Sequence, residues 1–185
     1  MTDDELRLAL REHAYLEGEF LLRSGRRSRY YLDKYRFETK PDLLRVLGER
    51  IADAVEEFEP EATRLAAPVL GAVVLAAAGS LASGLPFVIV RDAAKEYGTA
   101  NRIEGGYEEG ERVCLVEDVV TSGGALLEAV SALRDAGLTV ETAICVVDRE
   151  EGGAEALARE TVELRPFFRA SDLLNASKSA AKPHG

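Results

Sequence analysis

The feature that most constrains the fold of this chain is a series of short, continuously apolar runs that alternate with segments of helical pattern. The apolar runs are TRLAAPV, PFVIV, RVCLVEDVV, VETAICVVD and VELRPFF, and the helical segments between them are GAVVLAAAGSLASG, GGALLEAVSALRDAG and GGAEALARE. Strands that are apolar on both faces are typical of parallel sheets covered by helices on both sides. The pattern predicts an α/β fold with a central, mostly parallel β-sheet flanked by helices.

The N-terminal part shows a different pattern. DDELRLALREHAYL has Leu6 and Leu10 at helical spacing, and GEFLLRSGRRSRYYLDKYRF indicates two short strands around a Ser24–Gly25 turn. KPDLLRVLGERIADAVEEF then predicts a long helix that begins near Pro41. We expect a single domain over residues 1–185, with a helix and hood over about 1–40, a core over about 41–174 and a flexible tail over 175–185.

Composition excludes several classes of function. The 185 residues carry a formal net charge of −10, which argues against nucleic acid as the main partner because phosphate backbones are bound by lysine and arginine. No apolar run approaches the ~20 residues that span a bilayer, and the acidic start MTDDELRLAL lacks the basic segment of a signal peptide. Cys114 and Cys145 lie in apolar runs, so we expect two buried thiols and a reducing, cytoplasmic location. The acidic, lysine-poor composition resembles that of proteins from salt-loving organisms.

One stretch, VCLVEDVVTSGGALLEAV, combines features that point to a ligand. Its apolar run ends in Glu117 and Asp118, and the loop Thr121–Ala125 leads into a helical segment. Ligands of open α/β sheets bind beyond the carboxyl ends of the strands, and a helix N-terminus with exposed backbone N–H groups favours an anion. Carboxylates accept hydrogen bonds from sugar hydroxyls and can lie near Mg²⁺. A 5-phosphorylated ribose has this layout; the alternative is a solvated strand end followed by a tight turn.

Four stretches together resemble one family. VCLVEDVVTSGGA is similar to the phosphoribosyl pyrophosphate (PRPP) signature of the type I phosphoribosyltransferases. GEFLLRSGRRSRYYLDKYRF, VIVRDAAKEYGTANRIEG and VVDREEGG resemble the N-terminal segment, the mobile catalytic loop and the base-side segment of the orotate phosphoribosyltransferases. The four stretches occur in the family's order and cover roughly residues 15–175. The resemblance implies the type I phosphoribosyltransferase fold and a pentosyltransferase that joins PRPP and orotate, with Mg²⁺, in pyrimidine biosynthesis.

The resemblance also implies roles for individual residues. The catalytic residues would be Arg91, Lys95, Tyr97 and Asp118. PRPP would be bound by Glu117, Asp118, Val119, Val120, Thr121, Ser122, Gly123, Gly124 and Ala125, by Arg91 and Lys95, and on the pyrophosphate side by residues 66–71. Orotate would be bound by Arg149, Thr121, Arg23, Tyr30 and Tyr31. Mg²⁺ would be held mainly by PRPP, with Glu117 and Asp118 nearby. The loop of about residues 91–104 would close over the neighbouring subunit of a homodimer.

The chain departs from the family pattern at four of these positions. Asp92 stands where many members have a lysine that helps to bind pyrophosphate, and a carboxylate is unfavourable beside an anionic leaving group. Tyr97 replaces a histidine, Leu70 a basic residue and Gly124 a threonine or serine that are frequent in the family. We therefore expect activity with weaker or salt-shifted binding of the pyrophosphate end. The alternatives are a purine phosphoribosyltransferase and a non-catalytic regulator that senses PRPP.

Overall fold

The core of the molecule is a six-stranded sheet with the order β5-β4-β3-β6-β7-β8. The computed structural model describes residues 1–21, 27–92 and 102–175. Strands β3 (Arg64–Pro68), β4 (Phe87–Val90), β6 (Arg112–Val120), β7 (Thr139–Asp148) and β8 (Glu163–Arg169) are parallel, and the short β5 (Ile103–Glu104) is antiparallel to β4. The predicted fold class, a mostly parallel sheet flanked by helices, is confirmed.

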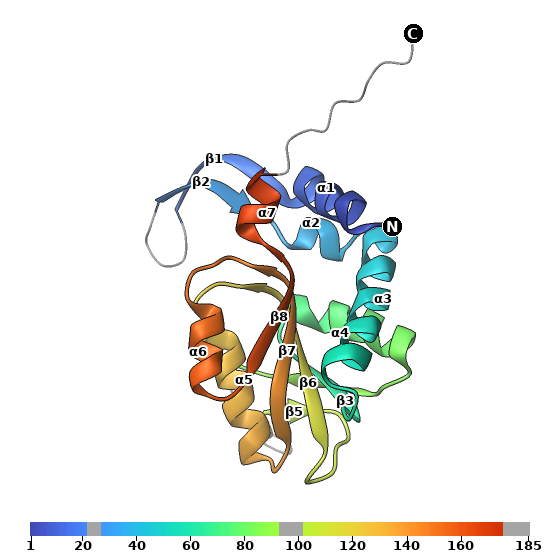
Figure 1. Ribbon diagram of the computed structural model, residues 1–185. Coiled ribbons are helices and arrows are strands. Elements are labelled where there is room, and N and C mark those ends of the chain that lie inside the picture. The colour runs from blue at the N-terminus through green and yellow to red at the C-terminus, as the bar shows by residue number, and fades with distance from the viewer. Residues whose placement is uncertain (22–26, 93–101, 176–185) are drawn as a thin grey trace.

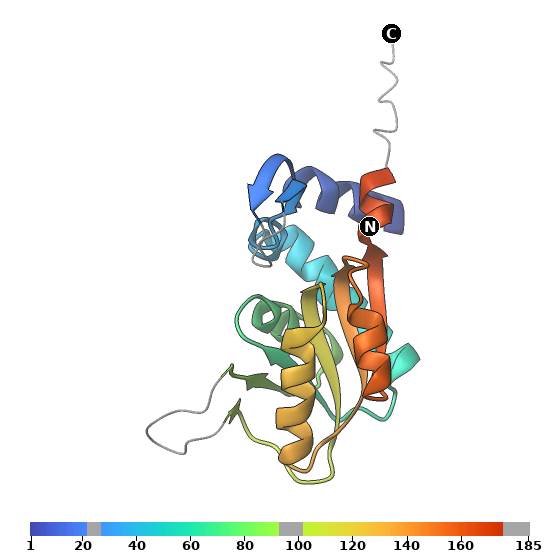
Figure 2. The ribbon, with the colours of Figure 1, turned by 90° about the vertical axis from the view of Figure 1, so that its left-hand side faces the viewer.

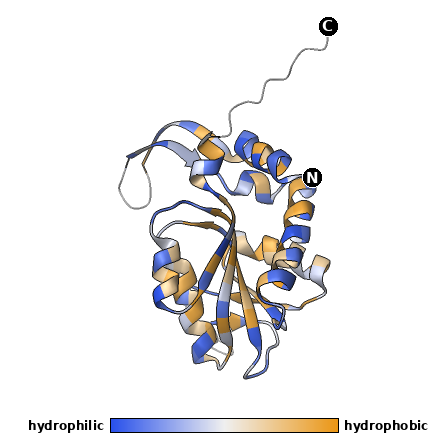
Figure 3. Cartoon of the chain, viewed as in Figure 1, coloured by the Kyte–Doolittle hydropathy of each residue, from blue (hydrophilic) through white to orange (hydrophobic). Residues whose placement is uncertain are grey.

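Helices cover both faces of this sheet (Figures 1 and 2). Helices α3 (Pro41–Phe58) and α4 (Gly71–Ser83) lie on one face, and α5 (Gly124–Asp135) and α6 (Gly153–Arg159) lie on the other. Along β6, Cys114 and Val116 belong to the apolar core on the α3 side, whereas Val113 and Leu115 belong to the core on the α5 side. Figure 3 shows the result as apolar strands between helices whose outer sides are polar. Because both faces of β6 are buried, its sequence is continuously apolar rather than alternating.

A smaller layer lies over the carboxyl ends of the parallel strands (Figure 1). It contains α1 (Asp3–Ala14), the hairpin of β1 (Tyr15–Leu21) and β2 (Arg27–Leu32), and the one-turn helix α2 (Tyr35–Glu38). The last described element, α7 (Ala170–Asn175), packs against α1, where the Arg11 guanidinium donates to the carbonyls of Leu173 and Leu174 at 2.9 and 2.7 Å. The C-terminal end of the described chain therefore returns to the N-terminal layer, which we call the hood.

The sequence pattern missed three short elements. The segment Tyr35–Glu38 forms α2, although it falls in a stretch expected to be strand, and neither β5 nor α7 was predicted. These elements have 4, 2 and 6 residues, which is too short for a period of 3.6 or 2 to be recognised. The Ser24–Gly25 turn, most of the proposed catalytic loop and the tail beyond residue 175 lie outside the described residues. Within the described ranges, no helix is both long and apolar enough to span a membrane.

Candidate active site

Two buried carboxylates stand at the carboxyl end of β6. The exposed fractions of Glu117 and Asp118 are 7% and 1%. The Asp118 carboxylate accepts a hydrogen bond from Lys34 Nζ, 2.7 Å from Oδ2, and one from the Val119 N–H, 2.5 Å from Oδ1. Glu117 Oε1 accepts from the Asp118 N–H at 3.0 Å. Burial of this kind does not fit a solvated strand end and instead indicates a built site under the hood.

The hood adds two charged residues that the sequence reasoning missed. Lys34 and Glu38 are four residues apart, at the start and the end of α2, and Glu38 is only 2% exposed. A side chain at Gly71, the first residue of α4, would overlap Asp118 Oδ2 and come within 2.9 Å of Glu38 Oε1. The carboxyl groups of Glu38 and Asp118 therefore meet over a position where only glycine fits. The i, i+4 spacing was the available signal, but it was hidden in a segment expected to be strand.

The crowding of carboxylates changes the charge state of the site. Burial and the negative charge of Asp118 raise the pKa of Glu117 to about 8 and that of Glu38 to about 8. Burial alone would lower the pKa of Lys34, but the charges of Asp118, Glu117 and Glu38 outweigh it and raise that pKa. The site thus favours protons, cations and hydroxyl donors next to its carboxylates.

The loop after β6 is shaped as an anion-binding loop. Thr121 and Ser122 are exposed, and Gly123, with a φ of 82°, precedes the first turn of α5. A small cavity of about 40 Å³ lies inside this loop and is lined by Glu117, Val119, Val120, Thr121, Gly123, Gly124, Ala125 and Leu126. The helix α6 supports the loop from behind, because a Cβ on Gly153 would overlap the Val120 side chain and lie 2.6 Å from the Thr121 carbonyl oxygen. A phosphate at this place meets backbone N–H groups at the N-terminus of α5.

Arg149 and Tyr30 form a wall beside this loop. Arg149 directly follows β7, where its N–H donates to the Val120 carbonyl at 2.8 Å, and Tyr30 belongs to the hood hairpin. The Arg149 guanidinium lies over the Tyr30 ring, with Cζ 5.1 Å from the ring centroid, and its Nη2 is 3.4 Å from the Tyr30 hydroxyl. Arg149 also pairs with Glu151 at 3.0 Å, although its side chain is only 8% exposed. The ring of Tyr30 in turn stacks on Tyr15, with 5.5 Å between centroids. Arg149 is thereby held at the border between the core and the hood.

Tyr31 is not brought together with Arg149. Successive side chains of a strand point to opposite faces, and Tyr31 lies on the other face of the hairpin, 5.5 Å from the Phe20 ring centroid. Arg23, Lys95 and Tyr97 lie outside the described residues, so their places in the site stay predictions.

The two remaining segments stand at the ends of β3 and β4. Ala66, Ala67 and Pro68 are buried in β3, whereas Leu70, in the loop before α4, is 69% exposed. Arg91 directly follows β4, and its Nη1 is 3.4 Å from Glu104 Oε1 on β5. Asp92 is exposed. The structure therefore aligns the ends of β3, β4, β6 and β7 along one edge of the sheet, below the hood.

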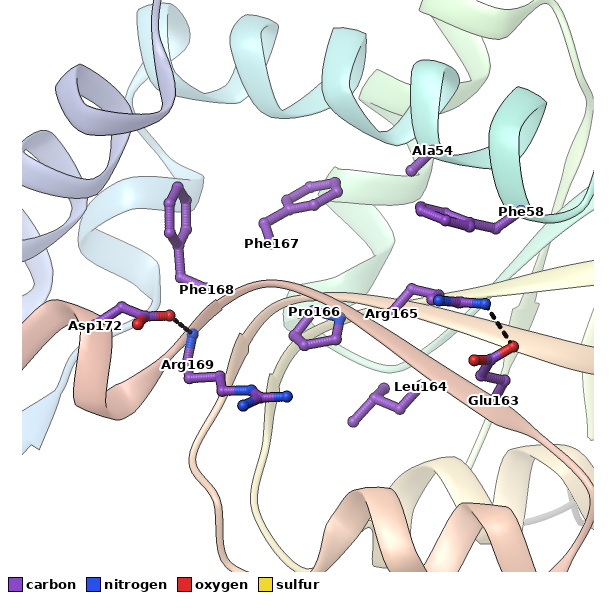
Figure 4. A pocket seen from close by; sticks show the side chains of 10 residues that line it. All are labelled: Ala54, Phe58, Glu163, Leu164, Arg165, Pro166, Phe167, Phe168, Arg169 and Asp172. Carbon is purple, nitrogen blue, oxygen red and sulfur yellow. Dashed lines mark hydrogen bonds and ion pairs between the residues drawn. The ribbon is translucent and has the colours of Figure 1, made fainter.

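A larger hollow lies elsewhere and shares no residue with this site (Figure 4). It has a volume of about 460 Å³, lies between α3 and β8, and includes Phe58, Arg165 and Phe167. Arg165 Cζ stands 4.4 Å from the Phe58 ring centroid, and the same guanidinium pairs with Glu163 at 2.7 Å. One of its two arginines, Arg165, is already paired, and this hollow lacks the buried carboxylates and the glycine loop of the carboxyl edge of the sheet.

Residues 36–165 match the family described as "Phosphoribosyl transferase domain". The orotate phosphoribosyltransferase of Halobacterium salinarum is 50% identical over 175 residues, which cover 95% of this chain and 98% of that protein. This relative also agrees with the resemblance of the composition to that of salt-loving organisms.

Solved structures give the same result. The orotate phosphoribosyltransferase of Mycobacterium tuberculosis in complex with Fe(III) dicitrate superposes with a TM-score of 0.82 at 32% identity, covering 92% of this chain and 98% of that chain. The same enzyme in complex with PRPP gives a TM-score of 0.77 at 31% identity, with the same coverage of both chains. Identity and coverage at this level, together with a buried acid pair and a glycine loop in the expected positions, place this chain in the orotate phosphoribosyltransferase family.

Proposed function

We propose that this protein is an orotate phosphoribosyltransferase, a pentosyltransferase that joins PRPP and orotate to give orotidine 5′-monophosphate and pyrophosphate. The observation that carries the proposal is that the buried pair Glu117–Asp118, the glycine loop after β6 and the Arg149–Tyr30 contact all lie at the carboxyl ends of β6 and β7. These three groups suit a substrate pair that has ribose hydroxyls, a phosphate and a carboxylate on the base.

PRPP binds along the carboxyl edge of β6 and β3 in this proposal. The 5-phosphate enters the loop of residues 119–125, where the backbone N–H groups and the hydroxyls of Thr121 and Ser122 donate to it. The ribose hydroxyls donate to Glu117 and Asp118. The diphosphate lies toward residues 66–71, which end at the tightly packed Gly71. Leu70 is exposed and uncharged, so the positively charged side chains that offset the charge of the diphosphate come from other segments.

Orotate binds against the wall formed by Arg149 and Tyr30. A planar guanidinium suits a carboxylate because it can donate two parallel hydrogen bonds. Arg149 is held in place by the Tyr30 ring, and its Nε has no hydrogen-bond partner although it is buried. Thr121 and Arg23 complete the orotate contacts in this proposal, and Tyr31, on the other face of the hairpin, is left out.

Magnesium enters with PRPP rather than through a site made by the protein alone. Among the described residues, no group of three or more His, Cys, Asp or Glu side chains is arranged to hold a metal ion. Glu117 and Asp118 nevertheless supply hard carboxylate oxygens beside the place of the ribose and the diphosphate, which is the ligand type that Mg²⁺ prefers. We propose that the diphosphate holds the ion, with these carboxylates nearby, and that the ion offsets the charge of the leaving group.

Catalysis depends on charge stabilisation and on exclusion of water. Cleavage at C1 of the ribose leaves an oxocarbenium-like centre, which the Asp118 carboxylate stabilises, and a diphosphate. Arg91 and Lys95 offset the charge of the diphosphate, and Tyr97 donates a hydrogen bond to it. Orotate N1 is already acidic in the free base, so no strong protein base is required. Closure of the loop of about residues 91–104 excludes water, which otherwise competes as the nucleophile.

The surface of α4 supports a homodimer. The exposed apolar side chains Val74 and Leu81 are seven residues apart and so lie on one side of α4, and exposed Leu70 directly precedes this helix. Leu81 is 90% exposed, which is unusual for leucine and typical of an interface. We propose that two copies pair through this stripe and that the loop of each copy reaches the site of its neighbour. The free, buried thiols of Cys114 and Cys145 support a cytoplasmic location.

A panel of bases tests the proposed reaction. The protein is incubated with PRPP and Mg²⁺ and with orotate, uracil, adenine, hypoxanthine or xanthine, and the release of pyrophosphate is measured. We expect pyrophosphate release with orotate and with none of the other bases, and we expect orotidine 5′-monophosphate as the product. Release with a purine base instead would replace the proposal by a purine phosphoribosyltransferase.

A further inference from the structure

Two residues of the hood reach across to the acid pair of the core. Lys34 Nζ lies 2.7 Å from Asp118 Oδ2, and Glu38 buries its carboxyl group beside the same carboxylate, above Gly71. Lys34 directly precedes the one-turn helix α2 and Glu38 is its last residue, so one short helix supplies both groups. Asp118 is thus held from the hood as well as by its own strand.

The two groups have complementary effects on Asp118. Lys34 compensates its charge, and its side chain is 32% exposed, so it lies at the mouth of the site and not in the core. Glu38 is 2% exposed, and its Oε1 has no hydrogen-bond partner although it is buried. A buried acid in contact with another acid is retained at a cost in stability, and such groups are concentrated at functional sites.

The same segment connects Asp118 to the base side of the site. Tyr30, which packs on Arg149, lies on β2, and β2 ends at Leu32, two residues before Lys34. A shift of this segment therefore moves the Arg149 wall and the support of Asp118 together. The geometry gives the hood a role in binding the ribose as well as the base.

We propose that Lys34 and Glu38 are positioning residues for the transfer reaction, which fix the Asp118 carboxylate in the orientation that accepts the ribose hydroxyl of PRPP. The inference rests on the role proposed above for Asp118. Lys34 supplies the ionic contact, and Glu38 acts in its uncharged form as a hydrogen-bonding neighbour. Glu38 is 2% exposed and meets the Asp118 carboxyl group over Gly71, and two carboxyl groups that share a buried position favour a proton on one of them.

Calorimetric titration of the full-length protein with PRPP and Mg²⁺ tests the inference without relying on turnover. Lys34→Met and Glu38→Leu should each raise the Kd for PRPP at least about tenfold, because a carboxylate without its support no longer holds one orientation. Lys34→Arg and Glu38→Gln should keep the Kd within about threefold. Arginine keeps the positive charge, and the glutamine amide keeps a hydrogen-bond donor and an acceptor in place of the uncharged carboxyl group. The matched control is Arg36→Met on the same turn, since Arg36 is exposed and pairs only with Asp33 among the described residues; it should leave the Kd unchanged.

A double-variant cycle separates positioning from direct contact with the ligand. If Lys34 acts through Asp118, adding Lys34→Met to Asp118→Asn should change the Kd for PRPP by less than about twofold. If Lys34 touches PRPP itself, the two losses should multiply, and the positioning role would be overturned. The melting temperature and circular dichroism of every variant show whether the fold is retained. If Lys34→Met or Glu38→Leu unfolds, the conservative variants Lys34→Arg and Glu38→Gln still test the inference, because a Kd raised more than about threefold in either would contradict it.

The outcomes for the inference and for the proposed function are distinct. Wild-type Kd values in folded Lys34→Met and Glu38→Leu proteins would overturn the inference while orotate turnover stayed intact. Loss of orotate turnover in the wild type, with the Kd pattern as expected, would overturn the proposed reaction and keep the role of Lys34 and Glu38 in PRPP binding. A Glu38→Gln protein that binds as poorly as Glu38→Leu would also contradict the inference, because it would mean that the charge of Glu38 is needed.

Discussion

Arg149, which the proposed function assigns to the orotate carboxylate, is held in place by its neighbours in the absence of a ligand. Its side chain is 8% exposed, its guanidinium lies against Tyr30, and Glu151 is 3.0 Å away. The Arg149 side chain loses its rotamer freedom when the protein folds, so less conformational entropy is lost when a ligand binds. Glu151 occupies one donor of the guanidinium and leaves others for a ligand.

Replacement of Arg149 should act on one substrate only. Arg149→Ala removes a charge-assisted hydrogen-bond pair of about 2–3 kcal/mol, so the KM for orotate should rise roughly 30- to 150-fold while the KM for PRPP changes little. Steady-state kinetics with each substrate varied in turn measures both constants. Equal changes in the two constants would contradict the assigned role.

The buried carboxyl groups predict an unusual dependence of stability on pH. The folded state raises the pKa of Glu38 and of Glu117 from an ordinary 4.5 to about 8, so it binds protons that the unfolded chain releases. The free energy of unfolding should therefore fall as pH rises from about 4.5 to 8, and Glu38→Gln should reduce this decline. Urea unfolding between pH 5 and 9 measures this decline in the free energy of unfolding, and Glu49→Gln on the exposed side of α3 is the control. A stability that rises over this range would contradict the burial of these acids in uncharged form.

At the scale of elements, the phosphate loop depends on a helix that does not belong to it. The N-terminus of α6 touches the loop through Gly153, where the contacts leave no space for a side chain. Gly153→Ala should therefore push residues 120–121 outward, raise the KM for PRPP several-fold and destabilise the protein by about 1–3 kcal/mol. Gly106→Ala is the matched control, because a Cβ there meets nothing within 4 Å. An unchanged KM for PRPP in the Gly153 variant would show that the loop does not hold the phosphate.

The same scale shows what sequence patterns can and cannot predict. The runs that became β6 and β7, and the helix closed by Gly84 in its left-handed conformation, were predictable because burial on both faces and a glycine cap leave clear signals. The pair Glu117–Asp118 was predictable because it ends a buried strand. The contacts of Lys34 and Glu38 with Asp118 were not predictable. Lys34 and Asp118 are 84 residues apart in the chain, and the local patterns that reveal helices and strands carry no information about such a contact.

For the whole molecule, the proposed dimer determines which loop serves which site. Mixing Lys95→Ala with Asp118→Asn should restore about a quarter of the wild-type activity, because half of the dimers are mixed and each of these has one site with both residues intact. The activity of the mixture is compared with that of each variant alone after exchange of subunits. Adding Leu81→Glu to both proteins should abolish the recovery by breaking the α4 contact, which light scattering would register as monomers. Recovery without dimers, or none with mixed dimers present, would contradict the exchange of loops.

The acidic surface of the whole chain bears on the departure at Asp92. A net charge of −10 repels a polyanionic substrate, and salt reduces that repulsion over distances beyond ~3 Å at molar concentration. Asp92 is exposed and therefore open to the same screening. We expect KCl to improve PRPP binding in this protein, in agreement with its similarity to the Halobacterium salinarum enzyme.

The most direct test of the account follows orotate by its ultraviolet absorbance in the presence of PRPP and Mg²⁺, at low and at molar KCl, for the wild type and for Asp118→Asn. The account predicts that the wild type consumes orotate and releases an equal amount of pyrophosphate, faster at molar KCl, and that Asp118→Asn is at least about 100-fold slower. If the wild type binds PRPP and leaves orotate unconsumed at both salt concentrations, the acid pair at the end of β6 belongs to a PRPP sensor and not to a transferase.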